Sequence, residues 1–372
     1  MKLDDMKKRK IRLGILFGGR SAEHEVSLQS AKNIVEAIDT DKYDIVLIGI
    51  DKQGSWLLPQ SAEFLIGTTN PRLLKLNRAG PGVILAPKTK NADLVSLSDH
   101  RPLETVDVIF PVLHGPYGED GTVQGLLKLA NIPYVGPDVL GSALGMDKDV
   151  QKRLLREAGI PTAPFRILRR STYAEKDLSG IVKELGLPVF VKPANLGSSV
   201  GINKAKTKKQ LAAAIKEAFL FDNKIIVEER IEGREIECSV LGNEKPIASV
   251  PGEVIPRHEF YSYEAKYIDE NGALLKIPAN IPSRIKKKIQ RLSIKTFRTL
   301  CCEGMARVDL FLKKNGQVVI NEINTIPGFT IISMYPKLWE ASGIPLKKLI
   351  DRLIGLAIER HERDQKLKVS YR

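Results

Sequence analysis

The chain has 372 residues, of which 43% are hydrophobic and 27% are charged. This length predicts two or three domains, and no apolar run approaches the roughly 20 residues that a bilayer requires, so we expect no membrane span. Only three cysteines occur, two of them adjacent (Cys301 and Cys302), which argues against a disulfide framework and for a reducing, cytoplasmic location. The formal net charge of +14 is spread along the chain, and its densest run, 284–291, is interleaved with apolar residues at helical spacing. We therefore expect no nucleic-acid partner and interpret the charge as a field that attracts an anionic small molecule.

Apolar runs, glycine turns and helical patterns alternate in the first third of the chain. Residues 12–17 predict a strand that ends at Gly18-Gly19, and residues 27–37 carry helical periodicity. Further apolar runs at 44–50 and 106–113 indicate a parallel α/β unit, in which ligand-binding groups gather at the carboxyl ends of the strands. The polar, poorly periodic region 60–100 is interpreted as surface loops.

The rest of the chain changes from helices to strands. A helix is predicted from Met146-Asp147-Lys148 to Gly159, then a strand at 188–192 and a helix at 207–220. From residue 225 onward, alternating apolar residues predict several strands, with a hairpin turn at 313–316. A last helix is expected over 346–361, followed by a disordered tail after Arg360.

The late strands carry a set of oxygen donors. Glu322 and Asn324 lie two residues apart and so share one face of a strand, and Asp309 joins that face if its strand pairs with theirs. Mg²⁺ prefers one or two carboxylates together with substrate phosphates. A solvated strand face is the alternative, but an unpaired carboxylate in such apolar strands would be costly to bury.

The glycine-rich segment 197–201 (GSSVG) has two incompatible interpretations. It fits the G-x-S-x-G pattern of a hydrolase elbow with Ser199 as nucleophile, yet Lys192 just upstream and Lys148 suit phosphate binding. Glycines let a loop turn its amides towards phosphate oxygens. Because the segment continues into Ile202-Asn-Lys, which is not a helix start, we favour the phosphate loop.

Other common motifs are missing from the sequence. There is no G-x-x-x-x-G-K-[ST] and no G-x-G-x-x-G that closes a strand, and neither His24-Glu25 nor His258-Glu259 continues into a zinc motif. Glu228 ends an apolar run and could meet an adenine amino group, and Glu235 could meet ribose hydroxyls, although alone these are weak signals.

Together these parts match a known family. The chain resembles the ATP-grasp ligases, and within them the D-alanine–D-alanine ligases, from residue 12 to about 355. The motifs that carry the resemblance are GGRSAEHEVS (18–27), LHG (113–115) with GEDG (118–121), MDK (146–148), VKP (191–193) with GSSVG (197–201), YEAKY (263–267), ARVD (306–309) and NEINTIPG (321–328). The resemblance implies an α/β (mixed α+β) fold of three domains: an N-terminal α/β domain over 1–137, a central ATP-grasp domain over 138–227 and a C-terminal one over 228–372.

The resemblance also implies a role for each matching residue. Glu25 is expected to hold the ammonium of the first D-alanine, with Ser198 and Tyr267 hydrogen-bonded nearby, while Arg307 and the Gly328 amide form the oxyanion site. The remaining matches are His114 beside the first D-alanine, Ser333 and Met334 for the second, Lys148, Lys192, Ser199, Glu228, Glu235 and Lys266 for ATP, and Asp309, Glu322 and Asn324 for the metal.

The implied reaction is the ATP-dependent joining of two D-alanines through a D-alanyl phosphate, with two Mg²⁺ ions or Mn²⁺ in their place. A loop over 256–271 is expected to close over the site, and its Tyr267 motif favours an amine acceptor. The alternatives are a D-alanine–D-lactate or D-alanine–D-serine ligase and, further away, a non-catalytic ATP-binding protein of the same fold. A cytoplasmic homodimer that serves peptidoglycan synthesis is expected.

Overall fold

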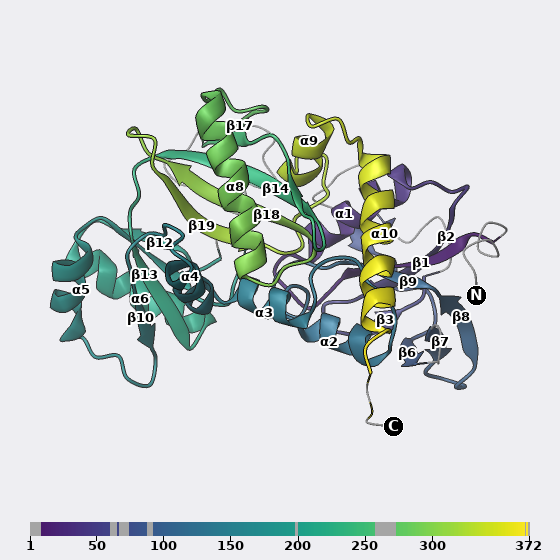
Figure 1. The fold of residues 1–372 in the computed structure, drawn as a ribbon. Helices are drawn as coiled ribbons and strands as arrows, with labels where there is room; N and C mark the ends of the chain where they lie inside the picture. The colour runs from purple at the N-terminus through teal and green to yellow at the C-terminus, as the bar shows by residue number, and fades with distance from the viewer. Residues whose placement is uncertain are drawn as a thin grey trace.

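The computed structural model describes residues 9–59, 65–66, 74–87, 92–197, 200–256, 273–368 and 370. Three of its sheets form the body of the molecule (Figure 1). In that view the sheet of β10 to β13 lies at the left, the sheet that contains β14, β18 and β19 lies in the middle, and the N-terminal sheet lies at the right. Within the described ranges, no helix is both long and apolar enough to cross a membrane.

The N-terminal sheet has the strand order β3-β2-β1-β9. β1 (Ile11–Gly18) pairs in parallel with β2 (Tyr43–Ile50) and β9 (Val108–Val112), and β3 (Trp56–Leu57) pairs antiparallel with β2. The parallel strands are apolar on both faces because helices cover both sides. α1 (His24–Ala37) shares one core cluster with the sheet, and α2 (Thr122–Leu129) shares another. The predicted parallel α/β unit is therefore confirmed.

A small antiparallel sheet corrects part of the interpretation of residues 60–100. β6 (Val83–Pro87), β7 (Ala92–Ser96) and β8 (Pro102–Val106) pair in the order β6-β7-β8, and β4 (Leu65–Ile66) pairs with β5 (Lys75–Leu76). The prediction of loops over 60–100 was wrong for β4 to β7, while β8 follows that region. Each contributes only one or two buried apolar residues, such as those at 83, 85 and 94, so the alternation is too short to stand out from the polar background.

The central sheet is antiparallel and has the order β10-β13-β11-β12. Its strands are β10 (Phe165–Arg169), β11 (Val189–Pro193), β12 (Asn203–Ala205) and β13 (Lys224–Glu229). The helices α5 (Asp177–Leu185) and α6 (Lys208–Phe221) cover one face with Ile181, Leu211 and Ile215. Because both helices lie on that face, the opposite face can accept a ligand.

The third sheet has six strands and receives helices from two parts of the chain. Its strands are β14 (Arg234–Gly242), β15 (Ile247–Ala248), β16 (Gly252–Pro256), β17 (Ala273–Lys276), β18 (Gly304–Leu312) and β19 (Val318–Asn324). α8 (Ser283–Thr299) packs on this sheet, as does α4 (Lys148–Glu157), which follows α3 (Val139–Met146). The predicted hairpin turn is present, since Gly316 donates its amide hydrogen to the Lys313 carbonyl.

The C-terminal helices join this sheet to the N-terminal one. After α9 (Met334–Glu340), α10 (Leu346–Asp364) buries Leu349, Leu353 and Ile354 in the same cluster as Phe17 and Phe110. α10 continues past Arg360, so the predicted disorder from that residue was wrong. Arg360 is buried because it donates hydrogen bonds to the carbonyl groups of Tyr134 and Gly136.

Candidate active site

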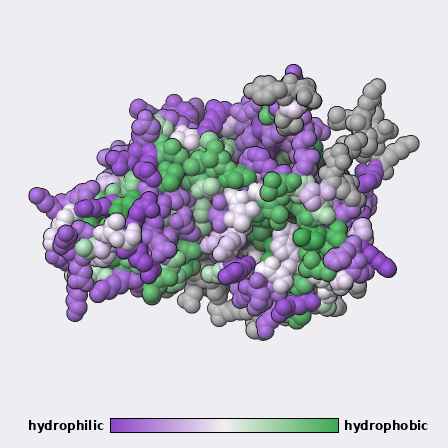
Figure 2. Space-filling model, turned by 90° about the horizontal axis from the view of Figure 1, so that it is seen from below, coloured by the Kyte–Doolittle hydropathy of each residue, from purple (hydrophilic) through white to green (hydrophobic). Residues whose placement is uncertain are grey.

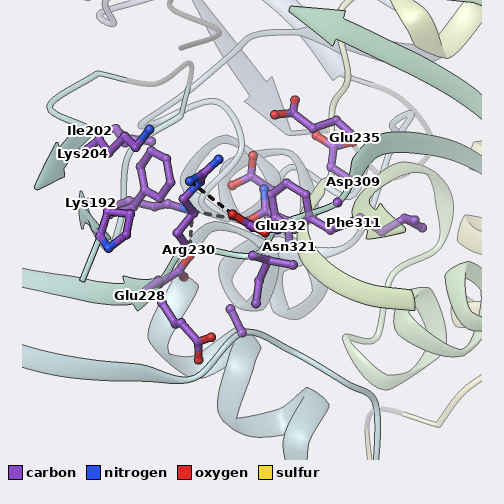
Figure 3. Close-up of a pocket in the computed structure, with 18 of the residues that line it drawn as sticks. Lys192, Ile202, Lys204, Glu228, Arg230, Glu232, Glu235, Asp309, Phe311 and Asn321 are labelled. Atoms are coloured by element: carbon purple, nitrogen blue, oxygen red, sulfur yellow. Dashed lines mark hydrogen bonds and ion pairs between the residues drawn. The ribbon is translucent and has the colours of Figure 1, made fainter. Parts of the chain in front are cut away.

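A cavity of about 710 Å³ lies between the central sheet and the six-stranded sheet. This volume is in the range of small-molecule and cofactor sites. In Figure 3, Lys192 and Lys204 lie on one side and Glu235, Asp309 and Phe311 on the other. The segment between β13 and β14 borders the same cavity, which therefore has a wall from each sheet.

Lys192 and Glu228 form a buried ion pair in the wall of this cavity. Phe190 lies opposite Glu228 in the antiparallel register of β11 and β13, and Lys192 shares a face with Phe190 by alternation. The Lys192 Nζ lies 2.7 Å from Glu228 Oε2 and 3.3 Å from Asn321 Oδ1. Burial opposes both charges, but the nearby lysines lower the pKa of Glu228 to about 2, and the nearby carboxylates raise the pKa of Lys192.

Lys148 begins α4 and contacts the residue before the glycine-rich segment. Asp147 caps the helix by accepting hydrogen bonds from the amides of Asp149 and Val150. The Lys148 Nζ donates to the Leu196 carbonyl at 2.6 Å and lies 3.8 Å from Glu322 Oε2. An ammonium group therefore lies between the segment predicted to bind phosphate and a carboxylate predicted to bind metal.

The predicted metal ligands meet on β18 and β19. Asp309 lies directly opposite Glu322 in the antiparallel register, and the Asn324 side-chain amide donates to Asp309 Oδ2 at 2.9 Å. Two carboxylates and an amide oxygen beside a lysine-lined cavity fit Mg²⁺ that is also bound to phosphate. Within the described ranges, no group of three or more His, Cys, Asp or Glu side chains has a metal-binding arrangement. The described residues therefore do not form an all-carboxylate metal site.

Arg307 is held by two carboxylates. Its Nε lies 2.7 Å from Asp309 Oδ1 and 2.8 Å from Glu237 Oε2, and its Nη2 donates to Asp309 Oδ2 at 2.7 Å. The bidentate contact fixes the plane of the guanidinium group. The predicted oxyanion donor is thus placed next to a predicted metal ligand.

A second, smaller cavity continues from the first. Glu322 and Ile202 line both cavities, and Glu119, Lys148, Gly197 and Asn324 line only the second. Burial and the charge of Glu23 raise the pKa of Glu119 to about 8, although Glu119 accepts hydrogen bonds from the amides of Gly115 and Ile326.

The structure brings Glu23, and not Glu25, to this place. The Glu23 carboxylate is buried next to Gly115 and Gly197. A Cβ atom added at Gly115 would lie 2.5 Å from Glu23 Oε2, and one added at Gly197 would lie 3.0 Å from it. Glu25 extends from α1 to Lys52 at 2.5 Å, and that lysine outweighs burial and lowers the pKa of Glu25. This placement argues against the predicted role of Glu25.

His114 and Ser30 position the loop that contains Gly328. His114 Nδ1 lies 3.0 Å from the Ile326 carbonyl oxygen, which can only accept, so this nitrogen carries the proton. Nε2 therefore accepts from the Ser30 hydroxyl at 3.2 Å, and Ser30 accepts from the Phe329 amide. Burial lowers the pKa of His114 to about 4, which keeps the ring neutral. Its predicted contact with D-alanine stays a prediction.

The residues predicted to bind the second D-alanine, Ser333 and Met334, follow the same loop. A Cβ atom at Gly328 would lie 2.8 Å from Ser333 Oγ, so the glycine lets the loop approach this hydroxyl. Met334 opens α9, and its side chain packs with Val254 and Leu338. The Met334 side chain is therefore buried in this cluster, and the predicted contact of Met334 with the second D-alanine stays a prediction.

Four predicted residues lie outside the described ranges: Ser198, Ser199, Tyr267 and Lys266. Most of the predicted closing loop over 256–271 lies outside them too. Their roles, and the choice between a hydrolase elbow and a phosphate loop at Ser199, stay predictions.

Two family models match the chain. The model of the D-ala D-ala ligase N-terminus matches residues 12–137, and the model of the D-ala D-ala ligase C-terminus matches residues 154–355. The chain belongs to the D-alanine–D-alanine ligase family. Among curated relatives, a D-alanine–D-alanine ligase of Shouchella clausii is 56% identical over 97% of this chain and 98% of its own length, and D-alanine–D-alanine ligase A of Escherichia coli is 53% identical over 97% and 99%.

Solved structures of this family agree in fold. The D-alanine–D-alanine ligase from Coxiella burnetii is 41% identical with a TM-score of 0.83, covering 96% of both chains. The VanG D-Ala:D-Ser ligase from Enterococcus faecalis is 38% identical with a TM-score of 0.82, covering 94% of this chain and 100% of its own. The predicted mixed α/β fold of the ATP-grasp type is confirmed, while the domain boundaries at 137 and 227 stay predictions.

Sequence reasoning missed Glu23, Glu237 and Lys152 as candidate site residues. Glu23 precedes α1 and Glu25 lies in its first turn, and each has a buried residue three or four positions on, Ser27 and Leu28 respectively, so helical spacing does not distinguish the two glutamates. Glu237 and Lys152 gave no signal either, because their partners come from distant parts of the chain.

Proposed function

We propose that this member of the D-alanine–D-alanine ligase family joins two molecules of D-alanine, consuming one ATP. The observation that carries the proposal is the continuity of two cavities. The one of about 710 Å³ suits a nucleotide, and it shares Glu322 and Ile202 with the smaller one, beside which Glu23 lies. A terminal phosphate at these shared residues would lie next to the second cavity, which has a volume of about 40 Å³.

The chemistry requires that the first carboxyl group be activated, since oxide is a poor leaving group. A carboxylate oxygen of the first D-alanine attacks the γ-phosphorus, the bond to the bridging oxygen breaks, and ADP leaves. The neutral amine of the second D-alanine then attacks the acyl carbon, phosphate leaves with the bonding electrons, and the nitrogen loses a proton. Arg307 and the Gly328 amide are the proposed oxyanion donors, and removing one such donor typically costs about 2.7–4 kcal/mol of transition-state stabilisation.

The other side chains have matching tasks. We assign the ammonium of the first D-alanine to Glu23, because its carboxylate lies next to Gly197, which lines the second cavity. Asp309, Glu322 and Asn324 would hold Mg²⁺, as two ions, or Mn²⁺ in its place. The bound metal would neutralise charge on the phosphoryl group. Lys148 and Lys192 add fixed positive charge from the protein itself.

The deciding experiment is the mass of the product. Incubation with ATP, Mg²⁺ and D-alanine is expected to yield D-alanyl-D-alanine, with one ADP and one phosphate released for each dipeptide. Parallel reactions contain added D-serine or D-lactate, since a D-Ala:D-Ser ligase is among the similar structures. A predominantly mixed product would favour the alternative specificity. Nucleotide binding without release of ADP would favour a non-catalytic protein and contradict the proposal.

The cellular setting is also proposed. The product would supply peptidoglycan synthesis and thereby cell shape, and the three free thiols suit a reducing cytoplasm. A homodimer is proposed because α2 and α3 expose Leu126, Leu129 and Leu140, on a face where Figure 2 shows apolar side chains gathered. Light scattering of the purified chain tests the dimer, and a monomeric mass at micromolar concentration would contradict it.

A further inference from the structure

α4 presents a second lysine one turn after Lys148. Lys152 is fully buried, with a side-chain exposure of 1%, and does not line the cavity. Its Nζ lies 3.1 Å from Glu228 Oε1 and donates to the Asn321 carbonyl at 3.1 Å. An ammonium group is costly to bury without partners, and burial lowers the pKa of Lys152.

Lys152 completes an arrangement in which Glu228 has a lysine on each oxygen. Lys192 meets Oε2 from the cavity side, and Lys152 meets Oε1 from behind the cavity wall. Asn321 contributes its side-chain oxygen to Lys192 and its carbonyl oxygen to Lys152. The carboxylate therefore lies between two positive charges that keep it ionised, and Lys192 does not have to neutralise it alone.

We propose that Lys152 is a positioning residue for nucleotide specificity: it orients the Glu228 carboxylate so that the cavity accepts a base with an amino group, as in adenine, and rejects one with a keto oxygen, as in guanine. This inference rests on the proposed function. An ionised carboxylate accepts from the 6-amino group of adenine and repels the 6-oxygen of guanine. Without Lys152, Glu228 turns towards Lys192, which draws that lysine away from the nucleotide.

The experiment compares Lys152→Met with wild type. Steady-state kinetics with saturating D-alanine give kcat and KM for ATP and for GTP, and calorimetry gives the Kd of each nucleotide without D-alanine. The expected result for Lys152→Met is a KM for ATP raised about tenfold, a smaller change in kcat, and an ATP-to-GTP preference in kcat/KM lowered by about tenfold or more. Lys152→Arg, which keeps a positive donor, is expected to restore part of the preference.

Lys295→Met is the matched control. Lys295 donates to the Ala158 carbonyl just after α4, at 2.5 Å, but does not touch Glu228. The Lys295→Met variant tests whether loosening α4 alone changes the ATP-to-GTP preference in kcat/KM, and no change is expected. A similar fall in preference for Lys295→Met would overturn the proposal.

A folded Lys152→Met with an unchanged ATP-to-GTP ratio would also overturn the proposal, even if overall activity fell, because a merely structural role affects both nucleotides alike. Should this variant fail to fold, Lys152→Gln, which keeps a neutral donor, is judged by the same ratio. The Kd values keep the two proposals distinguishable. A wild-type chain that binds ATP but makes no dipeptide contradicts the ligase function. The ratio of the ATP and GTP Kd values, compared between wild type and Lys152→Met, still tests the role of Lys152.

Discussion

At the scale of single residues, the site depends on which side chain of a motif faces inward. Glu23 and Glu25 lie in the same motif at the start of α1, yet one is buried against Gly197 and the other pairs with Lys52 near the surface. His114 likewise uses both ring nitrogens within the protein. Burial and partners, rather than residue type, decide the task of each group.

The two glutamates can be separated by mutation. Glu23→Gln is expected to raise the KM for D-alanine and lower kcat/KM by about a hundredfold or more, because an ionised partner of the ammonium is lost. Glu25→Gln, the matched control, removes a partly exposed ion pair and should change activity less than about threefold. Steady-state phosphate release measures both. Equal losses in the two variants would contradict the assignment to Glu23.

His114 predicts a pH dependence of stability. Its pKa is 6.5 in the unfolded chain and about 4 in the folded one, so between these values the unfolded state binds more protons. Its contribution is complete above pH 6.5 and is lost as the pH falls towards 4, by up to about 3 kcal/mol. Urea unfolding at several pH values between these two gives the free energy of unfolding as a function of pH. This free energy should fall more steeply with falling pH for wild type than for His114→Gln. Parallel slopes would contradict a buried neutral histidine.

At the scale of elements, the strands were easier to predict than the pairs they form. The alternation that marks β18 and β19 is local, and it correctly placed Glu322 and Asn324 on one face. The pairing of Asp309 with Glu322 and the contact of Lys192 with Asn321 are relations between strands, which no local pattern contains. β6 and β7 escaped prediction for a different reason, because their alternation is too short to stand out from the polar background.

The start of α4 provides a prediction at this scale. Asp147 caps the helix and forms an ion pair with Lys224, and the next residue is Lys148. Asp147→Ala is expected to destabilise the protein by about 1–2 kcal/mol through the lost cap, and to weaken ADP binding because Lys148 loses its fixed position. Thermal unfolding and calorimetry measure the two effects. Asp177→Ala is the control, since it begins α5, away from the cavity, and unchanged ADP affinity for Asp147→Ala would contradict the link.

At the scale of the whole molecule, the site exists because three sheets are held together. α10 packs on the N-terminal sheet, and His114 and Glu119 both contact the loop that follows β19. These contacts join the part that carries Glu23 to the part that carries Gly328. The relative position of the two parts of the proposed site is therefore set by packing between the sheets.

Arg360 tests this joining. It is buried and donates to the Tyr134 and Gly136 carbonyl groups, and its guanidinium lies over the Tyr134 ring. Arg360→Met is expected to lower the free energy of unfolding by about 2–4 kcal/mol, because two buried carbonyl groups lose a charged donor. Arg352→Met, on the same helix, is the control. Denaturant unfolding that shows equal stability for both variants would contradict the prediction.

The sequence by itself determined the chemistry that the chain can offer: the oxygen donors of the late strands, the two lysines and the glycine loop follow from residue types and short-range periodicity. Only the tertiary structure decided which groups meet. It placed Glu23 ahead of Glu25, gave Glu228 a second lysine from α4, and held the Gly328 loop through His114. Local patterns follow from the geometry of one strand or helix, whereas these contacts join residues far apart in the chain, and their energies depend on burial that arises only when the sheets pack together.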